Sequence, residues 1–304
     1  MEYVLTTEKL SKRYGRFKAL DECTMHIEKG AIYGFVGKNG AGKTTLIRVI
    51  CGLQEPSAGT YTLYGRKNDD SSLAGIRRRI GAVVETPAVY EGMTAQENLR
   101  QQYRILGLPS FDTIPELLSL VGLEDTGKKK VRHFSLGMRQ RLGIAVALAS
   151  CPDFMILDEP ANGLDPEGII EIRELILKLN RERQITVLIS SHILSELSRL
   201  ATHYGFIDQG RIVQEIRADA LEQACRKCLR LRVSDTAALA RVLGERHLEY
   251  TILSDTEAEL YDRLEITDLV QALARENCKV LAMQEREENL EGYYVNLIGG
   301  GSHE

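Results

Sequence analysis

The stretch GKNGAGKTT, residues 37–45, lies between the apolar run AIYGFV at 31–36 and the helical pattern LIRVICGL at 46–53. It fits the pattern G-x-x-x-x-G-K-[ST], with the strand before it and the helix after it that this motif requires. Its glycines let consecutive backbone N–H groups turn towards an anion, and a helix that starts near Lys43 aims its positive end at the same point. The stretch therefore predicts a loop that binds a nucleoside triphosphate.

Two side chains of this loop carry specific chemistry. Lys43 is a mobile point charge that can reach the β- and γ-phosphates, and the Thr44 hydroxyl is a hard oxygen ligand for Mg²⁺. The loop residues that we predict to bind the nucleotide are Gly37, Asn39, Gly40, Ala41, Gly42, Lys43, Thr44 and Thr45.

The composition bounds the class of protein. The 304 residues have room for one large or two modest domains. With 43% hydrophobic residues, 27% charged residues and a formal charge of −4, the chain is globular in composition and has no global basic field, so we predict no nucleic-acid partner. The basic runs at 77–79 and 128–130 are interpreted as solvated or partner-facing surface.

Membrane and metal signals in the sequence are weak. No apolar run approaches the ~20 residues needed to cross a bilayer, and the N-terminal stretch is acidic, so we expect no signal peptide. Of the six cysteines, Cys225 and Cys228 form a lone pair without a second pair at zinc spacing. We therefore expect a cytosolic, reduced chain that works at a membrane only through another subunit.

The residues before the phosphate loop, 2–37, alternate in short apolar strands and predict a β-rich subdomain. Tyr14 in this region has two interpretations: strand-end packing, or stacking on an adenine, which is worth roughly 1–3 kcal/mol per base. After the loop helix, strand-like segments at 59–65 and 80–85 precede a helical pattern from about 94 to 130. The strand signal returns only at Phe154, which indicates a helical insert between the halves of a sheet domain.

Two acidic residues follow the apolar strand FMIL at 154–157. Adjacent carboxylates at a strand end repel one another, so this pattern is seldom useful outside a charged site. We predict that Asp158 holds Mg²⁺ and that Glu159 lies where an attacking water would be. The turn at 161–168 is followed by a helix that the pattern predicts at 169–180. A later strand at 185–191 ends at His192, which can hydrogen-bond a terminal phosphate. Strands that alternate with helices predict a mainly parallel sheet with its ligand at the carboxyl ends.

These motifs, in this order, resemble the nucleotide-binding subunits of ABC transporters over about residues 2–217. The matching features are the aromatic Tyr14, the phosphate loop, the signature SLGMRQR from Ser135, the strand MILDEP, the crossing loop NGLD with Asp165, and the switch histidine His192. The resemblance implies an α/β fold of the P-loop NTPase, ABC-type ATPase class, with a helical subdomain at about 94–150. It also makes Tyr14 an adenine contact.

Two positions depart from the usual family pattern. The signature begins Ser135-Leu136-Gly137 rather than Ser-Gly-Gly, and Glu85 stands where most members carry glutamine. Both features are similar to the bacitracin/lantibiotic-resistance group, which implies export of a peptide antibiotic or another amphiphile. Glutamate can ligate metal more strongly than glutamine, but it adds repulsion towards Glu159 and the γ-phosphate.

The resemblance implies a complete mechanism. Two Mg-ATP molecules bind at the interface of a homodimer, or of a heterodimer with a similar chain, and Ser135 and Gly137 of one subunit contact the nucleotide held by Lys43 of the other. The implied catalytic residues are Glu159, His192, Lys43 and Glu85, the implied metal ligands are Thr44, Asp158 and Glu85, and Asp165 joins the nucleotide-binding set. A transmembrane permease is the expected partner, and it would hold the cytoplasmic chain at the inner face of the membrane.

The C-terminal residues 218–304 follow a different pattern. They predict the order β-α-β-β-α-β of a small ferredoxin-like α+β domain, followed by a helix, with a role in dimerisation or regulation. Two other functions stay open at this point: a soluble ABC-type ATPase that acts on ribosomes or DNA, and a nucleotide sensor without hydrolysis. Against the first, the chain carries one ATPase unit and has no room for a long coiled coil between Thr45 and Ser135.

Overall fold

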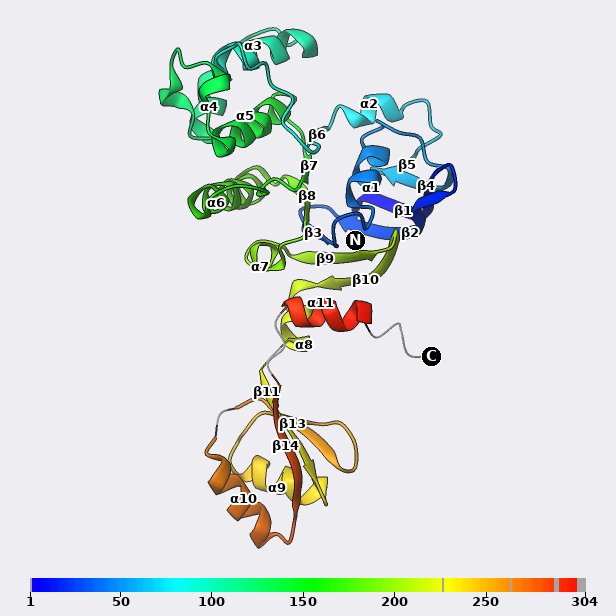
Figure 1. The fold of residues 1–304 in the computed structure, drawn as a ribbon, viewed down its shortest axis with the longest axis vertical. Helices are drawn as coiled ribbons and strands as arrows, with labels where there is room; N and C mark the ends of the chain where they lie inside the picture. Colours follow the sequence, from blue (N-terminus) through cyan, green and yellow to red (C-terminus); the bar gives the residue numbers. More distant parts are fainter. Residues whose placement is uncertain (1, 226, 263, 287–289, 300–304) are drawn as a thin grey trace. The chain divides into compact units, whose positions relative to one another are not determined.

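The computed structural model describes residues 2–225, 227–262, 264–286 and 290–299. The chain divides into two compact units, Met1–Ala218 and Asp219–Glu304. The first unit contains two sheets and a group of helices, and the second contains one sheet with its own core. Figure 1 colours the elements by their position along the chain.

A six-stranded sheet forms the centre of the first unit, in the order β10-β9-β3-β8-β7-β6. All its pairings are parallel except that of β9 with β10. Its strands are β3 (Ile32–Val36), β6 (Ile80–Val83), β7 (Phe154–Asp158), β8 (Thr186–Ser191), β9 (His203–Asp208) and β10 (Arg211–Arg217). Every residue of β3, β7 and β8 is buried, as expected for parallel strands that are covered on both faces.

A smaller antiparallel sheet, in the order β2-β1-β4-β5, carries the N-terminal residues. Its strands are β1 (Tyr3–Tyr14), β2 (Phe17–Glu28), β4 (Ala58–Leu63) and β5 (Arg66–Lys67). Helix α1 (Lys43–Ile50) buries Leu46, Ile47 and Ile50 in one core with residues of both sheets. The predicted β-rich subdomain and mainly parallel sheet are confirmed.

The segment between β6 and β7 is helical, as predicted, and Figure 1 shows α3, α4 and α5 grouped together. Its elements are α3 (Ala95–Leu106), α4 (Ile114–Leu120), two short 3₁₀ turns (Glu124–Thr126 and Val131–His133) and α5 (Leu136–Leu148). Helix α3 starts at a capping box in which Thr94 and Glu97 exchange hydrogen bonds of 2.7 and 3.1 Å. The remaining helices of the first unit are α2 (Leu73–Arg77), α6 (Pro166–Arg183) and α7 (Leu194–Leu197).

The boundaries of two elements differ from what the sequence pattern indicates. Helix α6 begins at Pro166, ahead of the start at Ile169 that the pattern favours, because the Asp165 side chain accepts a hydrogen bond from the Gly168 amide at 3.0 Å and caps the helix. Strand β6 ends at Val83, so Glu85 lies beyond the strand in a left-handed conformation with φ of 60°. The predicted strand at 80–85 was therefore too long.

The second unit has the ferredoxin-like element order, with its sheet in the order β12-β13-β11-β14. Its elements are β11 (Cys228–Val233), α9 (Thr236–Glu245), β12 (Tyr250–Ile252), β13 (Glu257–Leu260), α10 (Ile266–Arg275), β14 (Val280–Arg286) and α11 (Leu290–Gly299). A core that includes Leu231, Leu239, Leu243, Leu269 and Leu273 joins the sheet to α9 and α10. The sequence did not predict the short helix α8 (Ala218–Ala224) that precedes β11.

Candidate nucleotide site

The phosphate loop leaves the carboxyl end of the buried strand β3 and enters α1 at Lys43. Gly40 and Gly42 have φ of 82° and 114°, a region that favours glycine. A side chain at Gly37 would place its Cβ 2.6 Å from the Ile207 carbonyl oxygen, and one at Gly42 would lie 2.7 Å from that of Ala19. The backbone conformation therefore requires glycine at 40, the lack of space requires it at 37, and both reasons apply at 42. Asn39 is exposed.

Gly210, in the turn between β9 and β10, is hydrogen-bonded to the phosphate loop through its backbone. Its amide donates to the Ala41 carbonyl at 2.9 Å, and its carbonyl accepts from the Asp21 amide at 2.7 Å. Gly210 has φ of 78°, and a Cβ there would lie 2.8 Å from the Ala19 oxygen. The phosphate loop and strand β2 are thus joined through one glycine that belongs to no motif recognised in the sequence.

Lys43 is buried, with 5% of its side chain exposed, and points back along the loop. Its Nζ donates to the carbonyl oxygens of Gly37 at 2.5 Å and Lys38 at 3.2 Å, and lies 3.1 Å from Glu159 Oε1. A buried ammonium needs such partners because desolvation alone would disfavour its charge. The structure therefore brings together Lys43 and Glu159, which lie far apart in the sequence.

Thr44 and Asp158 place two hard oxygen donors side by side. Thr44 Oγ1 donates to Asp158 Oδ2 at 2.8 Å, and Asp158 is 1% exposed. Ser190 Oγ donates to the other oxygen, Asp158 Oδ1, at 2.6 Å. Proteins usually bind Mg²⁺ through one or two of their own oxygens, and substrate phosphates and water supply the other ligands. The two oxygen donors of Thr44 and Asp158 fit this mode of binding. The described residues contain no cluster of three or more His, Cys, Asp or Glu suited to a metal.

Glu159 follows Asp158 in a left-handed conformation, with φ of 50°. Non-glycine residues rarely adopt this conformation, and it is concentrated at functional sites. The Glu159 amide donates to Ser190 Oγ at 2.9 Å, and Glu159 Oε2 lies 2.7 Å from His192 Nδ1. The Glu159 carboxylate therefore lies between Lys43 and His192, with 19% of its side chain exposed.

Ser190 was missed in the sequence, although a signal for it existed. Strands β7 and β8 are parallel, and their register places Ser190 directly beside Asp158. Ser190 is fully buried, and its hydroxyl joins the backbone of Glu159 to the carboxylate of Asp158. A hydroxyl two residues before the strand-end histidine could have been recognised as a support for the acidic pair.

Glu85 is placed differently from the other acids. Its Oε1 lies 2.6 Å from Nη2 of Arg48 on α1, and 54% of its side chain is exposed. Within the described residues, its carboxylate is paired with Arg48 and is not brought to Thr44 or Asp158. No sequence motif singles out Arg48.

Tyr14 ends β1, with 43% of the residue exposed. Its hydroxyl donates to Gln54 Oε1, and Lys12 Nζ lies 5.5 Å from the ring centroid. Gln54 thus holds the hydroxyl and Lys12 lies over the ring, while part of the residue is open to solvent.

The signature and the crossing loop pack against each other. Ser135 caps α5, because its Oγ accepts from the Met138 amide at 3.2 Å. A Cβ on Gly163 would lie 3.3 Å from the Leu136 side chain, and one on Gly137 would lie 3.8 Å from that of Leu164. Ser135, Gly137 and Asp165 are therefore grouped at helix starts, and within the described residues no hydrogen bond joins them to the phosphate loop of the same chain.

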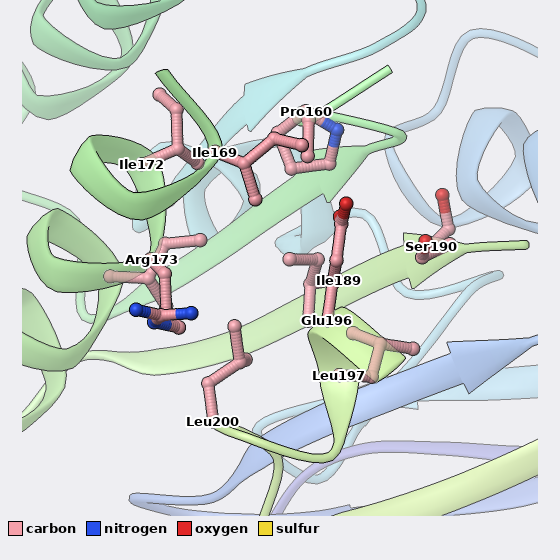
Figure 2. Close-up of a pocket in the computed structure, with 12 residues that line it drawn as sticks. Pro160, Ile169, Ile172, Arg173, Ile189, Ser190, Glu196, Leu197 and Leu200 are labelled. Atoms are coloured by element: carbon pink, nitrogen blue, oxygen red, sulfur yellow. The ribbon is translucent and has the colours of Figure 1, made fainter. Parts of the chain in front are cut away.

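A small cavity lies behind the acidic strand end, between α6, β8 and α7. Its volume of about 20 Å³ has room for about one water molecule, so it is no nucleotide pocket. Figure 2 shows Glu196 and Arg173 entering it among apolar side chains. Burial raises the pKa of Glu196, and the nearby Glu159 raises it further, while His192 and Arg173 act in the opposite direction.

The family model and the similar proteins that match this chain point to one family. The family model described as "ABC transporter" matches residues 20–162. The bacitracin transport ATP-binding protein BcrA of Bacillus licheniformis is 44% identical over 99% of both chains. The lantibiotic transport ATP-binding protein SrtF of Streptococcus pyogenes is 42% identical over 72% of this chain and 93% of its own.

Solved structures agree with this. The cbiO1 subunit from Clostridium perfringens, part of a cbiONQ ABC transporter complex, has a TM-score of 0.66 and 26% identity over 73% of this chain and 92% of its own. The dimeric ATP-binding cassette MJ0796, bound to ADP and Pi, has a TM-score of 0.63 and 26% identity over 70% of this chain and 98% of its own.

The chain belongs to the ABC transporter family. It is an ATPase subunit of that family, and the predicted fold class and nucleotide binding are confirmed. The alternative of an ATPase that acts on ribosomes or DNA is not favoured. No helix in the described ranges is long and apolar enough to span a bilayer.

Proposed function

We propose that this chain powers the export of a peptide antibiotic or a similar amphiphile by binding two Mg-ATP molecules across a dimer and moving a separate transmembrane permease. The two named relatives, which serve bacitracin and lantibiotic transport, support the substrate class. The absence of a spanning helix in the described residues is compatible with a permease on a separate chain that holds this one at the inner face of the membrane. We assign residues 1–217 to ATP hydrolysis and 218–304 to dimerisation or regulation.

One half of each site comes from the phosphate loop and the acidic strand end. When ATP binds, Lys43 would leave its ion pair with Glu159 and contact the β- and γ-phosphates instead. The Glu159 carboxylate would then be free to accept a proton from the attacking water. With both ring nitrogens protonated, His192 would donate Nδ1–H to that carboxylate and Nε2–H to the terminal phosphate. When bound, Mg²⁺ held by Thr44 and Asp158 would offset the negative charge of the phosphates.

The other half would come from the second subunit. Ser135 and Gly137 lie at the start of α5, where free backbone N–H groups favour an anion. Asp165, at the start of α6, would place the crossing loop beside the same interface. The observation that carries the proposal is the arrangement of Glu159, which contacts Lys43 and His192 at 3.1 and 2.7 Å.

The test is the Glu159→Gln variant of the full-length chain. Loss of the base should lower ATP turnover by about 10²–10⁴-fold while ATP binding is retained. At saturating Mg-ATP, light scattering should show a stable nucleotide-bound dimer. A matched control is Glu174→Gln, which removes an exposed carboxylate on α6 that is 64% accessible and should leave turnover unchanged.

Three results would contradict parts of the proposal. Near-wild-type turnover of the Glu159→Gln variant would remove Glu159 from the role of base. A variant that stays monomeric with saturating Mg-ATP would exclude the two-site dimer. A wild-type chain that is purified from membranes without a multi-span protein at equal stoichiometry would argue against the permease.

A further inference from the structure

Glu85 and Arg48 form an ion pair that the family pattern does not explain. Glu85 Oε1 and Arg48 Nη2 are 2.6 Å apart. Glu85 holds a left-handed backbone conformation with φ of 60°, which is uncommon outside glycine and costs free energy. The carboxylate is thus held at a defined place by a charged neighbour.

Arg48 belongs to the helix that carries the proposed metal-binding hydroxyl. It lies four residues after Thr44 on α1, and residues at this spacing share one face of a helix, about one turn apart. The helix cannot easily rotate, because Leu46, Ile47 and Ile50 are fully buried. Arg48 therefore places a fixed positive charge about one turn from Thr44.

The electrostatic setting explains why a cation is needed there. Asp158 and Glu159 already place two carboxylates at the end of β7, and the bound triphosphate adds further negative charge. A third uncompensated carboxylate at the rim of this site would weaken ATP binding, because like charges repel through a partly polar medium. A glutamine at position 85 would carry no such penalty.

We propose that Arg48 is the positioning residue for Glu85: it fixes this carboxylate at the rim of the nucleotide site and offsets its charge, so that glutamate can replace a neutral amide beside Mg-ATP. This inference rests on the proposed function of the same site. The pair is partly exposed, with 35% and 54% of the two side chains accessible, so it contributes little to folding stability and its variants should fold.

The experiment measures equilibrium ATP binding to the full-length chain, once in EDTA and once in Mg²⁺. Arg48→Gln leaves Glu85 uncompensated, so ATP binding in EDTA should weaken by about threefold to tenfold, with a smaller loss in Mg²⁺. In the Glu85→Gln background no carboxylate remains to be positioned, so the same Arg48→Gln change should cost less, because only the direct attraction of Arg48 for the phosphates is lost. Arg48→Lys should restore most of the binding, since it retains the charge but not the guanidinium geometry.

A matched control removes an arginine elsewhere. Arg66→Gln breaks an exposed pair of Arg66 with Asp70, whose closest atoms are 3.7 Å apart, and should leave both affinities unchanged. Equal losses from Arg48→Gln in the wild-type chain and in the Glu85→Gln background would overturn the proposal, as would the absence of any loss in EDTA. Because the readout is ATP binding, these outcomes are independent of whether Glu159→Gln abolishes hydrolysis.

Discussion

Replacing Ser190 by alanine should disturb both folding and Mg²⁺ binding. The Ser190 hydroxyl is fully buried, donates to Asp158 at 2.6 Å and accepts from the Glu159 amide at 2.9 Å. A hydrogen bond to a charged group is worth about 1.5–3 kcal/mol. The Glu159 amide keeps a second acceptor in the variant, the carbonyl of residue 190 at 3.2 Å. Loss of the bond from this amide to the hydroxyl therefore adds little to the cost.

We therefore expect Ser190→Ala to lower the free energy of unfolding by about 2–3 kcal/mol, which is a drop in Tm of roughly 4–12 °C for a unit of this size. Asp158 would also lose the bond that orients its carboxylate, and such supports are typically worth about 10–100-fold in metal affinity. The Mg²⁺ concentration for half-maximal hydrolysis should therefore rise at least about tenfold.

Two measurements check this prediction: thermal unfolding without nucleotide, and hydrolysis over a series of Mg²⁺ concentrations. Ser191→Ala is the matched control, because the Ser191 hydroxyl lies next along the strand and, among the described residues, bonds only the local backbone of Ile193, at 2.9 and 3.3 Å. It should cost about 1 kcal/mol and leave the Mg²⁺ dependence unchanged. If the two variants melt alike and share one Mg²⁺ curve, the assigned role of Ser190 is wrong.

Three other predictions follow from single side chains. Tyr14→Ala should weaken ATP binding by about 1–3 kcal/mol while Tyr14→Phe keeps most of it, and equal affinities in a binding titration would count against stacking. Burial raises the pKa of the Glu196 carboxyl above its usual 4.5, so this group holds its proton more tightly in the folded than in the unfolded chain. The free energy of unfolding therefore falls as the pH rises from 4.5 through the pKa of the folded state. Glu196→Gln should accordingly raise Tm by about 1–3 °C at pH 7 and by less as the pH approaches 4.5, whereas a pH-independent difference would contradict it. With a thiol reagent at pH 8, exposed Cys151 should react in the native chain, while Cys23, whose pKa burial raises to about 11, should react only on unfolding; peptide mapping of the labelled sites distinguishes them.

Sequence reasoning was most accurate where local pattern and chemistry coincide. The phosphate loop needs glycines, a lysine and a hydroxyl at fixed spacing between a strand and a helix, so residues 37–45 alone specify the local fold. The parallel sheet and the helical insert followed from the succession of apolar segments. The start of α6 was missed because it is set by the hydrogen bond from the Gly168 amide to the Asp165 side chain. The spacing of apolar residues, from which the helix was predicted, contains no information on such a cap.

The supporting residues could not be predicted in the same way. Arg48 and Ser190 have no motif of their own, and their roles depend on which residue the fold places beside them. The register of β7 with β8 brings Ser190 to Asp158, and the turn after β6 brings Glu85 to Arg48. Both pairings connect segments that are distant along the chain, so local sequence carries no direct record of them.

The glycine behind the phosphate loop has a consequence for how this chain tolerates change. Gly210 joins Ala41 to Asp21 through its own backbone, and any side chain there would collide with Ala19. In a saturation mutagenesis screen for loss of ATPase activity, position 210 should be as intolerant as the loop glycines themselves. A survey of natural variants that inspects only the recognised motifs would overlook a position where one methyl group should be enough to disable the enzyme.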